Sequence, residues 1–192
     1  MPRPDLLTKL ASVSTSLVLL ASCLFITASG EEPKAVSDFQ ARVTRYLELR
    51  KKDAGIAQRP SNSADKVSDT QEMLASKVKA LRPNAAQGDI FTPEIARYFR
   101  KQISTSLAGV EGRKIRASLK HAEPVHGVTI RVNEEYPEGT PLQSTPPTIL
   151  SAFPILPDSL EYRIVGRTLV LRDVAPNLVV DFIPSALPAF QE

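Results

Sequence analysis

Residues 160–183, which read LEYRIVGRTLVLRDVAPNLVVDFI, constrain the fold of this chain more than any other stretch. Apolar and polar residues alternate with a period of two over three short runs, and this period is typical of half-buried β-strands. Gly166 begins the turn after the first run, at a position that needs positive φ, which favours a two-residue hairpin. Pro176 and Asn177 are typical turn residues between the second and third runs. The stretch therefore predicts an antiparallel meander of three strands.

The third run is apolar on both faces, so we expect it to lie centrally in the sheet with cover on both sides. Strict alternation places Asp181 on the outward face, where it caps a neighbour or pairs with a cation, while Asp173 stabilises the preceding turn. The run 128–132 alternates in the same way and predicts a fourth strand. A meander of this size needs a second layer to be stable, and the helices that precede it are the candidates.

Four helices are predicted before the sheet, over 38–53, 70–81, 93–108 and 110–120. The third has the strongest start signal, because Thr92 can cap it, Pro93 suits the first helical position and Glu94 lies near the positive end of the helix dipole. Apolar residues at helical spacing around Phe99 make this helix the expected cover of the sheet, whereas the first helix is expected to be only loosely tied to the rest. One further helical turn is expected after Pro146.

The fold expected from these patterns is α+β. Three to four N-terminal helices pack on a small, mostly antiparallel sheet of four strands, which ends in the three-stranded meander.

The first thirty residues have the pattern of a secretory signal peptide. Arg3 and Lys9 give a positive start, an apolar run covers 17–27, and small residues follow as far as Gly30. The run is short for a membrane span, so removal of the leader near Gly30 is preferred over an anchor helix. Lipidation of Cys23, the only cysteine, is the other alternative. The predicted divisions are a signal peptide over 1–30, a helix with a polar linker over 31–66, and an α+β domain over 67–192.

Charge is divided unevenly along the chain. Residues 31–120 carry 18 Lys and Arg against 11 Asp and Glu, a net charge of +7, whereas residues 121–192 carry 4 against 9, a net charge of −5. Basic residues on the polar sides of the helices offer one surface for acidic polymers or anionic membranes: Arg42, Arg45, Arg97, Arg100, Lys101, Arg113, Lys114 and Arg116. The competing account, which we prefer, is solvated charge or internal pairing with Glu134, Glu135 and Asp181.

Few residues suggest catalysis or metal binding. His121 and His126 are the only histidines, and with Glu134 and Glu135 they are the candidate ligands of a metal ion. Pro124 interrupts the spacing between the two histidines, so histidines of a loop without a metal are the preferred interpretation. No serine lies in a Gly-x-Ser-x-Gly elbow, no glycine-rich phosphate loop occurs, and the few aromatic residues occupy core faces. The sequence therefore predicts no catalytic residue, no cofactor and no nucleic acid as partner.

Several segments carry a resemblance to known proteins: FQARVTRYLELRKK, GDIFTPEIARYFRK, YPEGTPLQSTPPTIL and LEYRIVGRTLVLRDVAPNLVVDFIP. Together with the leader they are similar to an uncharacterised family of predicted secreted bacterial proteins. That family has no assigned activity, so the resemblance implies export and transfers no catalytic residue. The segment EYRIVGRTLVL also resembles the terminal hairpin of small periplasmic nickel and cobalt homeostasis proteins, a likeness that covers one hairpin.

The leader and these patterns, together with the bacterial family that the resemblance implies, predict an exported bacterial protein, periplasmic or secreted, that acts without catalysis as a binding or structural module of the periplasm or cell envelope. Its expected partner is a protein or an envelope polymer, and we expect a monomer. The alternatives are a periplasmic metal-handling protein or a hydrolase with a site around His121 and His126. Lipidation at Cys23 would instead anchor the chain to a membrane.

Overall fold

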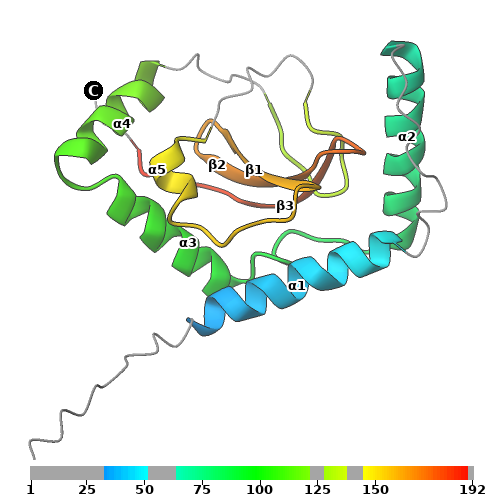
Figure 1. Ribbon diagram of the computed structural model, residues 1–192, viewed down its shortest axis with the longest axis horizontal. Coiled ribbons are helices and arrows are strands. Elements are labelled where there is room, and N and C mark those ends of the chain that lie inside the picture. The colour runs from blue at the N-terminus through cyan, green and yellow to red at the C-terminus, as the bar shows by residue number, and fades with distance from the viewer. Residues whose placement is uncertain (1–32, 52–63, 122–127, 138–144, 190–192) are drawn as a thin grey trace, which may run out of the picture. The chain divides into compact units, whose positions relative to one another are not determined.

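The computed structural model describes residues 33–51, 64–121, 128–137 and 145–189, which belong to one compact unit, Glu32–Glu192 (Figure 1). The helices and strands in these ranges are α1 (Lys34–Lys51), α2 (Ala64–Leu81), α3 (Pro93–Ser106), α4 (Gly109–His121), α5 (Pro147–Leu150), β1 (Leu160–Val165), β2 (Thr168–Asp173) and β3 (Leu178–Ile183). The class is α+β, as the sequence predicts. None of the helices in the described ranges is long and apolar enough to cross a membrane.

Two of the helices, α3 and α5, begin at their sequence signals. Thr92 caps α3, because its Oγ1 accepts the N–H of Ile95 at 3.4 Å, and Pro93 takes the first helical position. The short α5 follows Pro146 and also has a proline, Pro147, at its start, but no side-chain cap. α1 and α2 begin earlier than predicted, at Lys34 and Ala64.

An aromatic cluster joins the helices to the sheet. Phe99 of α3 has no exposed surface, and its ring centroid lies 5.1 Å from that of Phe39 in α1, 4.7 Å from Phe153 and 5.8 Å from Tyr162 in β1. Phe91, just before α3, lies 5.2 Å from Phe99 in an edge-to-face arrangement. Such tilted and edge-to-face contacts add stability beyond the burial of area. The expected loose attachment of the first helix is therefore wrong, since Phe39 belongs to this core.

The sheet has the strand order β1-β2-β3, and both pairs are antiparallel. Gly166 has a φ of +58°, as the predicted two-residue hairpin requires. The central strand of the described sheet is β2, so the prediction of a central β3 is wrong. The expected cover of β3 on both faces is confirmed, since five of its six residues are buried.

A β-bulge in β3 explains the position of Asp181. Leu171 pairs with Asp181, but the next residue, Arg172, pairs with Val179, so Val180 is one extra residue on β3. An extra residue interrupts the alternation of side chains along a strand. Val180 and Asp181 are both completely buried. The predicted outward position of Asp181 is therefore wrong, because it assumed an uninterrupted strand.

The second face of the sheet is covered by residues 128–136. A small apolar cluster forms there from Val128, Ile130, Tyr136, Val165, Val170, Val179 and Phe182. The predicted fourth strand over 128–132 does not form. Instead the chain turns at Asn133, which has a φ of 62°, and Glu135 makes an isolated bridge to Leu178. The alternation of Val128 and Ile130 thus reflects packing onto a sheet face rather than pairing along a sheet edge.

Phe99→Ala should lower the free energy of unfolding by roughly 3–5 kcal/mol, because it removes the ring that contacts both α1 and β1. Val110→Ala is the matched control, since Val110 is 61% exposed on α4 and should change stability by less than about 0.5 kcal/mol. Urea unfolding followed by circular dichroism measures both. A Phe99→Ala variant as stable as wild type would contradict the central place of this cluster.

Candidate anion-binding pocket

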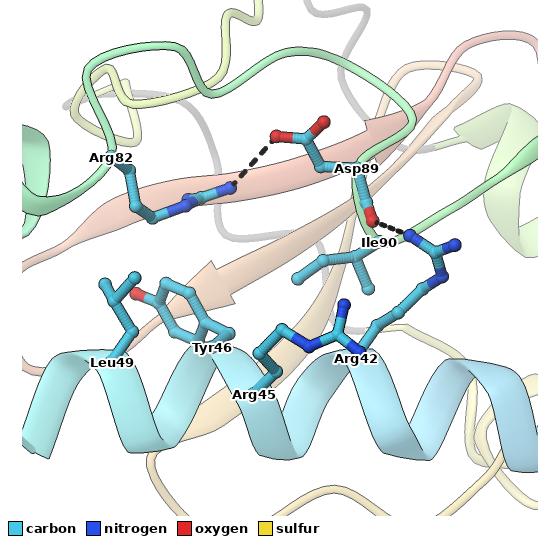
Figure 2. Close-up of a pocket in the computed structure, with 7 residues that line it drawn as sticks. All are labelled: Arg42, Arg45, Tyr46, Leu49, Arg82, Asp89 and Ile90. Carbon is cyan, nitrogen blue, oxygen red and sulfur yellow. Dashed lines mark hydrogen bonds and ion pairs between the residues drawn. The ribbon is translucent and has the colours of Figure 1, made fainter.

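A pocket of about 280 Å³ lies between α1 and the segment that joins α2 to α3 (Figure 2). Its lining consists of Arg42, Arg45, Tyr46 and Leu49 from α1, and Arg82, Asp89 and Ile90 from the joining segment. Residues three and four apart share one side of a helix, so α1 presents its four residues together. Three of the seven side chains are arginines, and their partners decide what the pocket can bind.

Arg42 connects α1 to the joining segment. Its Nη1 donates a hydrogen bond of 2.6 Å to the backbone carbonyl of Asp89, drawn in Figure 2. A backbone carbonyl carries no formal charge. The bond therefore fixes the guanidinium group of Arg42 without neutralising it.

Arg82 is held mainly by neutral groups. Its Nη1 donates to Asn133 Oδ1 at 3.2 Å, and its Nη2 donates to the carbonyl of Val180, in the bulge of β3, at 3.3 Å. The guanidinium carbon lies 5.1 Å from the ring centroid of Tyr46, a cation–π contact. Its carboxylate partner is Asp89, and the distance from Nη2 to Oδ2 is a long 3.8 Å. Arg82 is thus well ordered by the fold and only partly compensated in charge.

Arg45 is exposed, and no hydrogen bond or ion pair links it to another described residue. Three guanidinium groups and the carboxylate of Asp89 give the pocket lining a formal charge of +2. The arrangement is suited to hold an anion through charge-assisted hydrogen bonds.

The loop before α3, which carries Asp89, is shaped by Asp181. Oδ1 of Asp181 accepts the N–H groups of Gly88 at 3.0 Å and Phe182 at 2.8 Å, and Oδ2 accepts those of Ile90 at 2.8 Å and Phe91 at 2.7 Å. Burial raises the pKa of Asp181, while these backbone hydrogen bonds act in the opposite direction. The N–H groups of Gly88, Ile90 and Phe91 are therefore already occupied by the side-chain oxygens of Asp181.

Tyr46 and Arg50 fix the C-terminal half of α1 on the sheet. The Tyr46 hydroxyl donates to Asp173 Oδ2 at 2.7 Å, and Arg50 Nε lies 3.1 Å from the same oxygen. Burial raises the pKa of Asp173, and the hydrogen bond from Tyr46 and the charge of Arg50 oppose the rise. Burial and the neighbouring Asp173 carboxylate raise the pKa of the Tyr46 hydroxyl, so it remains a proton donor. Asp173, predicted to stabilise a turn, also anchors α1.

Of the acids in the second half, Asp173 pairs with Arg50 of α1, but Glu134, Glu135 and Asp181 have other partners. Glu134 pairs with Arg131 at 3.4 Å, and Glu135 accepts the side-chain amide of Asn177 at 3.2 Å. Asp181 is occupied by backbone N–H groups. The predicted pairing of the helix cations with these three acids is therefore wrong, while solvated charge, the other part of the preferred interpretation, stays a prediction.

The cations of α3 and α4 have other neighbours. Arg100 donates to the carbonyl of Pro184 at 3.0 Å, and Arg116 donates to the carbonyl of Leu107. Lys114 pairs with Glu111 of its own helix at 2.8 Å. Because backbone carbonyls leave a cation's charge uncompensated, these helices keep a basic surface.

The predicted metal ligands are not brought together in the described part of the chain. His121 ends α4, but its side chain and the whole of His126 lie outside the described residues, as do Cys23 and Gly30. Glu134 and Glu135 are exposed, with the partners given above. Among the described residues, no group of three or more His, Cys, Asp or Glu side chains could hold a metal ion.

Comparison with known proteins finds no matching family, no curated relative and no similar solved structure. The function must therefore be inferred from the pocket.

Sequence reasoning named two of the three arginines of the pocket. Arg42 and Arg45 belong to the basic residues predicted for the first helix, whereas Arg82 and Asp89 were missed as site residues. The motif Arg82-Pro83 at the end of a helix, followed by Gly88-Asp89 in a loop, was the available signal. This motif gives no information on the distance between Arg82 and α1, because the joining segment and α1 meet only in the folded chain.

Asp181→Ala should lower the free energy of unfolding by roughly 3 kcal/mol or more, because it leaves the buried N–H groups of Ile90 and Phe91 without an acceptor. Asp181→Asn keeps one acceptor oxygen and should destabilise less. Glu134→Gln removes an exposed ion pair and should change stability by less than about 1 kcal/mol. Thermal and urea unfolding rank the three variants, and an Ala variant as stable as Glu134→Gln would show that the loop does not depend on this carboxylate.

Proposed function

We propose that this protein is an exported, non-catalytic binding module of the bacterial periplasm or cell envelope. It holds an acidic group of a partner protein or an envelope polymer in the arginine pocket. The observation that carries the proposal is the exposed Arg45 beside Arg42 and Arg82, two cations that are bonded largely to neutral acceptors.

The pocket is prepared for a ligand before the ligand arrives. Hydrogen bonds already hold the side chains of Arg42 and Arg82, so the binding of an anion orders mainly the side chain of Arg45. Fewer groups ordered on binding means a smaller loss of conformational entropy and a higher affinity. The uncompensated cations of α3 and α4 extend the positive field over the surface and favour approach by anionic partners.

Asp89 is the one acid of the pocket lining, and its Oδ2 already accepts the N–H of Ala86 and lies 3.8 Å from Arg82 Nη2, so we assign it a structural part and prefer binding to catalysis. A general base must lie within hydrogen-bond reach of the substrate. Asp173 and Asp181 are completely buried, and both are engaged in holding elements of the fold together. The seven residues that line the pocket include no serine, cysteine, histidine or lysine to serve as a nucleophile beside Asp89.

Arg45→Gln should weaken binding of fluorescent poly-L-glutamate about tenfold at low salt, since a charge-assisted hydrogen bond is worth about 1.5–3 kcal/mol. The matched control is Arg97→Gln, which removes the same charge from an exposed position on α3 and should have a much smaller effect. Fluorescence anisotropy measures both, and binding should weaken from about 50 to about 150 mM salt. Equal losses in the two variants would assign binding to general surface charge instead of the pocket.

Export is proposed from the leader pattern and predicts a processed chain. Mass spectrometry of the protein recovered from the periplasm or medium should find an N-terminus close to Gly30. A chain that begins at a lipid-modified Cys23 would replace this proposal with membrane anchoring, and a chain retaining Met1 in the cytoplasm would contradict export.

A further inference from the structure

The residues around the three arginines restrict the chemical class of anion that the pocket can accept. Resting on the proposed function, we propose that the arginine pocket selects a carboxylate carried on a short apolar body, in preference to a phosphate. Three features of the lining lead to this assignment.

The first feature is the lack of free backbone donors in the adjacent loop. Phosphate sites commonly use clusters of backbone N–H groups at a loop or helix start. In this loop the N–H groups of Gly88, Ile90 and Phe91 all point to Asp181, and the N–H of Ala86 donates to Asp89 Oδ2 at 2.9 Å. A ligand therefore meets arginine side chains in place of a backbone cradle. Planar guanidinium groups match carboxylate and phosphate oxygens alike, so without a backbone cradle the choice between the two anions depends on the rest of the lining.

The second feature is the carboxylate of Asp89 inside the lining. It is about half exposed and lies 3.8 Å from Arg82 Nη2, so an anion that approaches Arg82 also approaches Asp89. A phosphate group carries about 1.5 to 2 negative charges near neutral pH, and a carboxylate carries one. The repulsion from Asp89 is therefore smaller for the carboxylate. The formal charge of +2 on the lining is enough to accept one such group.

The third feature is the apolar part of the lining. Leu49 and Ile90 lie among the arginines, and Figure 2 shows Leu49 beside the ring of Tyr46 on α1. These groups offer no hydrogen bond to a phosphate oxygen, but they can cover a few carbon atoms of a ligand. A pocket of about 280 Å³ has room for an acidic group with a short branched chain.

The test uses the purified full-length protein and four probes: 4-methylpentanoate, its neutral amide, acetate and inorganic phosphate. NMR titration should show 4-methylpentanoate binding at least about threefold more tightly than acetate or phosphate, with shifts at the methyl groups of Leu49 and Ile90. The amide should not bind. Arg45→Gln should weaken 4-methylpentanoate about tenfold or more, and Arg97→Gln should leave it within about twofold. Leu49→Ser should reduce the preference for 4-methylpentanoate over acetate, because it removes apolar cover.

Two contrary results have different meanings. If phosphate binds more tightly than 4-methylpentanoate and depends on Arg45, the carboxylate assignment is overturned while the pocket remains an anion site. If none of the anions binds, or if binding is the same in Arg45→Gln and Arg97→Gln, the proposed function itself is overturned.

Discussion

The carboxylate of Asp181 accepts four backbone N–H groups in the protein interior, and the path of the chain between α2 and α3 depends on these hydrogen bonds. A buried carboxylate is unfavourable unless its oxygens are well satisfied, and buried N–H groups are unfavourable without acceptors. The buried carboxylate therefore needs the N–H groups as donors, and the buried N–H groups need the carboxylate as acceptor. The result is a loop whose backbone position is fixed by a residue of the sheet, which in turn fixes Asp89 and Ile90 in the pocket.

The opposite side of the pocket depends on how α1 is attached. Phe39 packs into the aromatic core near one end of the helix, and Tyr46 with Arg50 bonds to Asp173 near the other. Two separated attachments fix both the tilt of the helix and its rotation about its own axis. Arg42 and Arg45 lie between these attachments, so their orientation follows from them. Arg82 completes the arrangement because the bulge of β3 supplies the carbonyl of Val180 as an acceptor.

Local patterns predicted much of this fold. Thr92 and Pro93 mark the start of α3, Gly166 marks a hairpin, and the period of two in 160–183 marks the three strands. Such features depend on neighbouring residues and can be seen in a sequence. The class of the fold and the participation of Phe99 in the core followed from them.

Features that depend on contacts between distant segments were not predictable in this way. A bulge needs only one extra residue, and the apolar sequence around Val180 gives no sign of it, so strict alternation placed Asp181 on the wrong side. The residues 128–132 alternate as a strand does, yet they cover a sheet face. Arg82 joined the candidate site only through its proximity to Tyr46 and Asp89. The basic character of α1 was visible in the sequence, but the pocket was not.

The wide separation of these contacts along the chain bears on the order of folding. Tyr46 and Asp173 are 127 residues apart, and Phe91 and Asp181 are 90 residues apart. Contacts between residues so distant close large loops, and they form late relative to local helical structure. A chain that ended after α5 would hold every arginine of the pocket but none of the strands that orient them. The proposed affinity for an acidic ligand therefore requires the last strand of the chain, although none of the pocket arginines belongs to a strand.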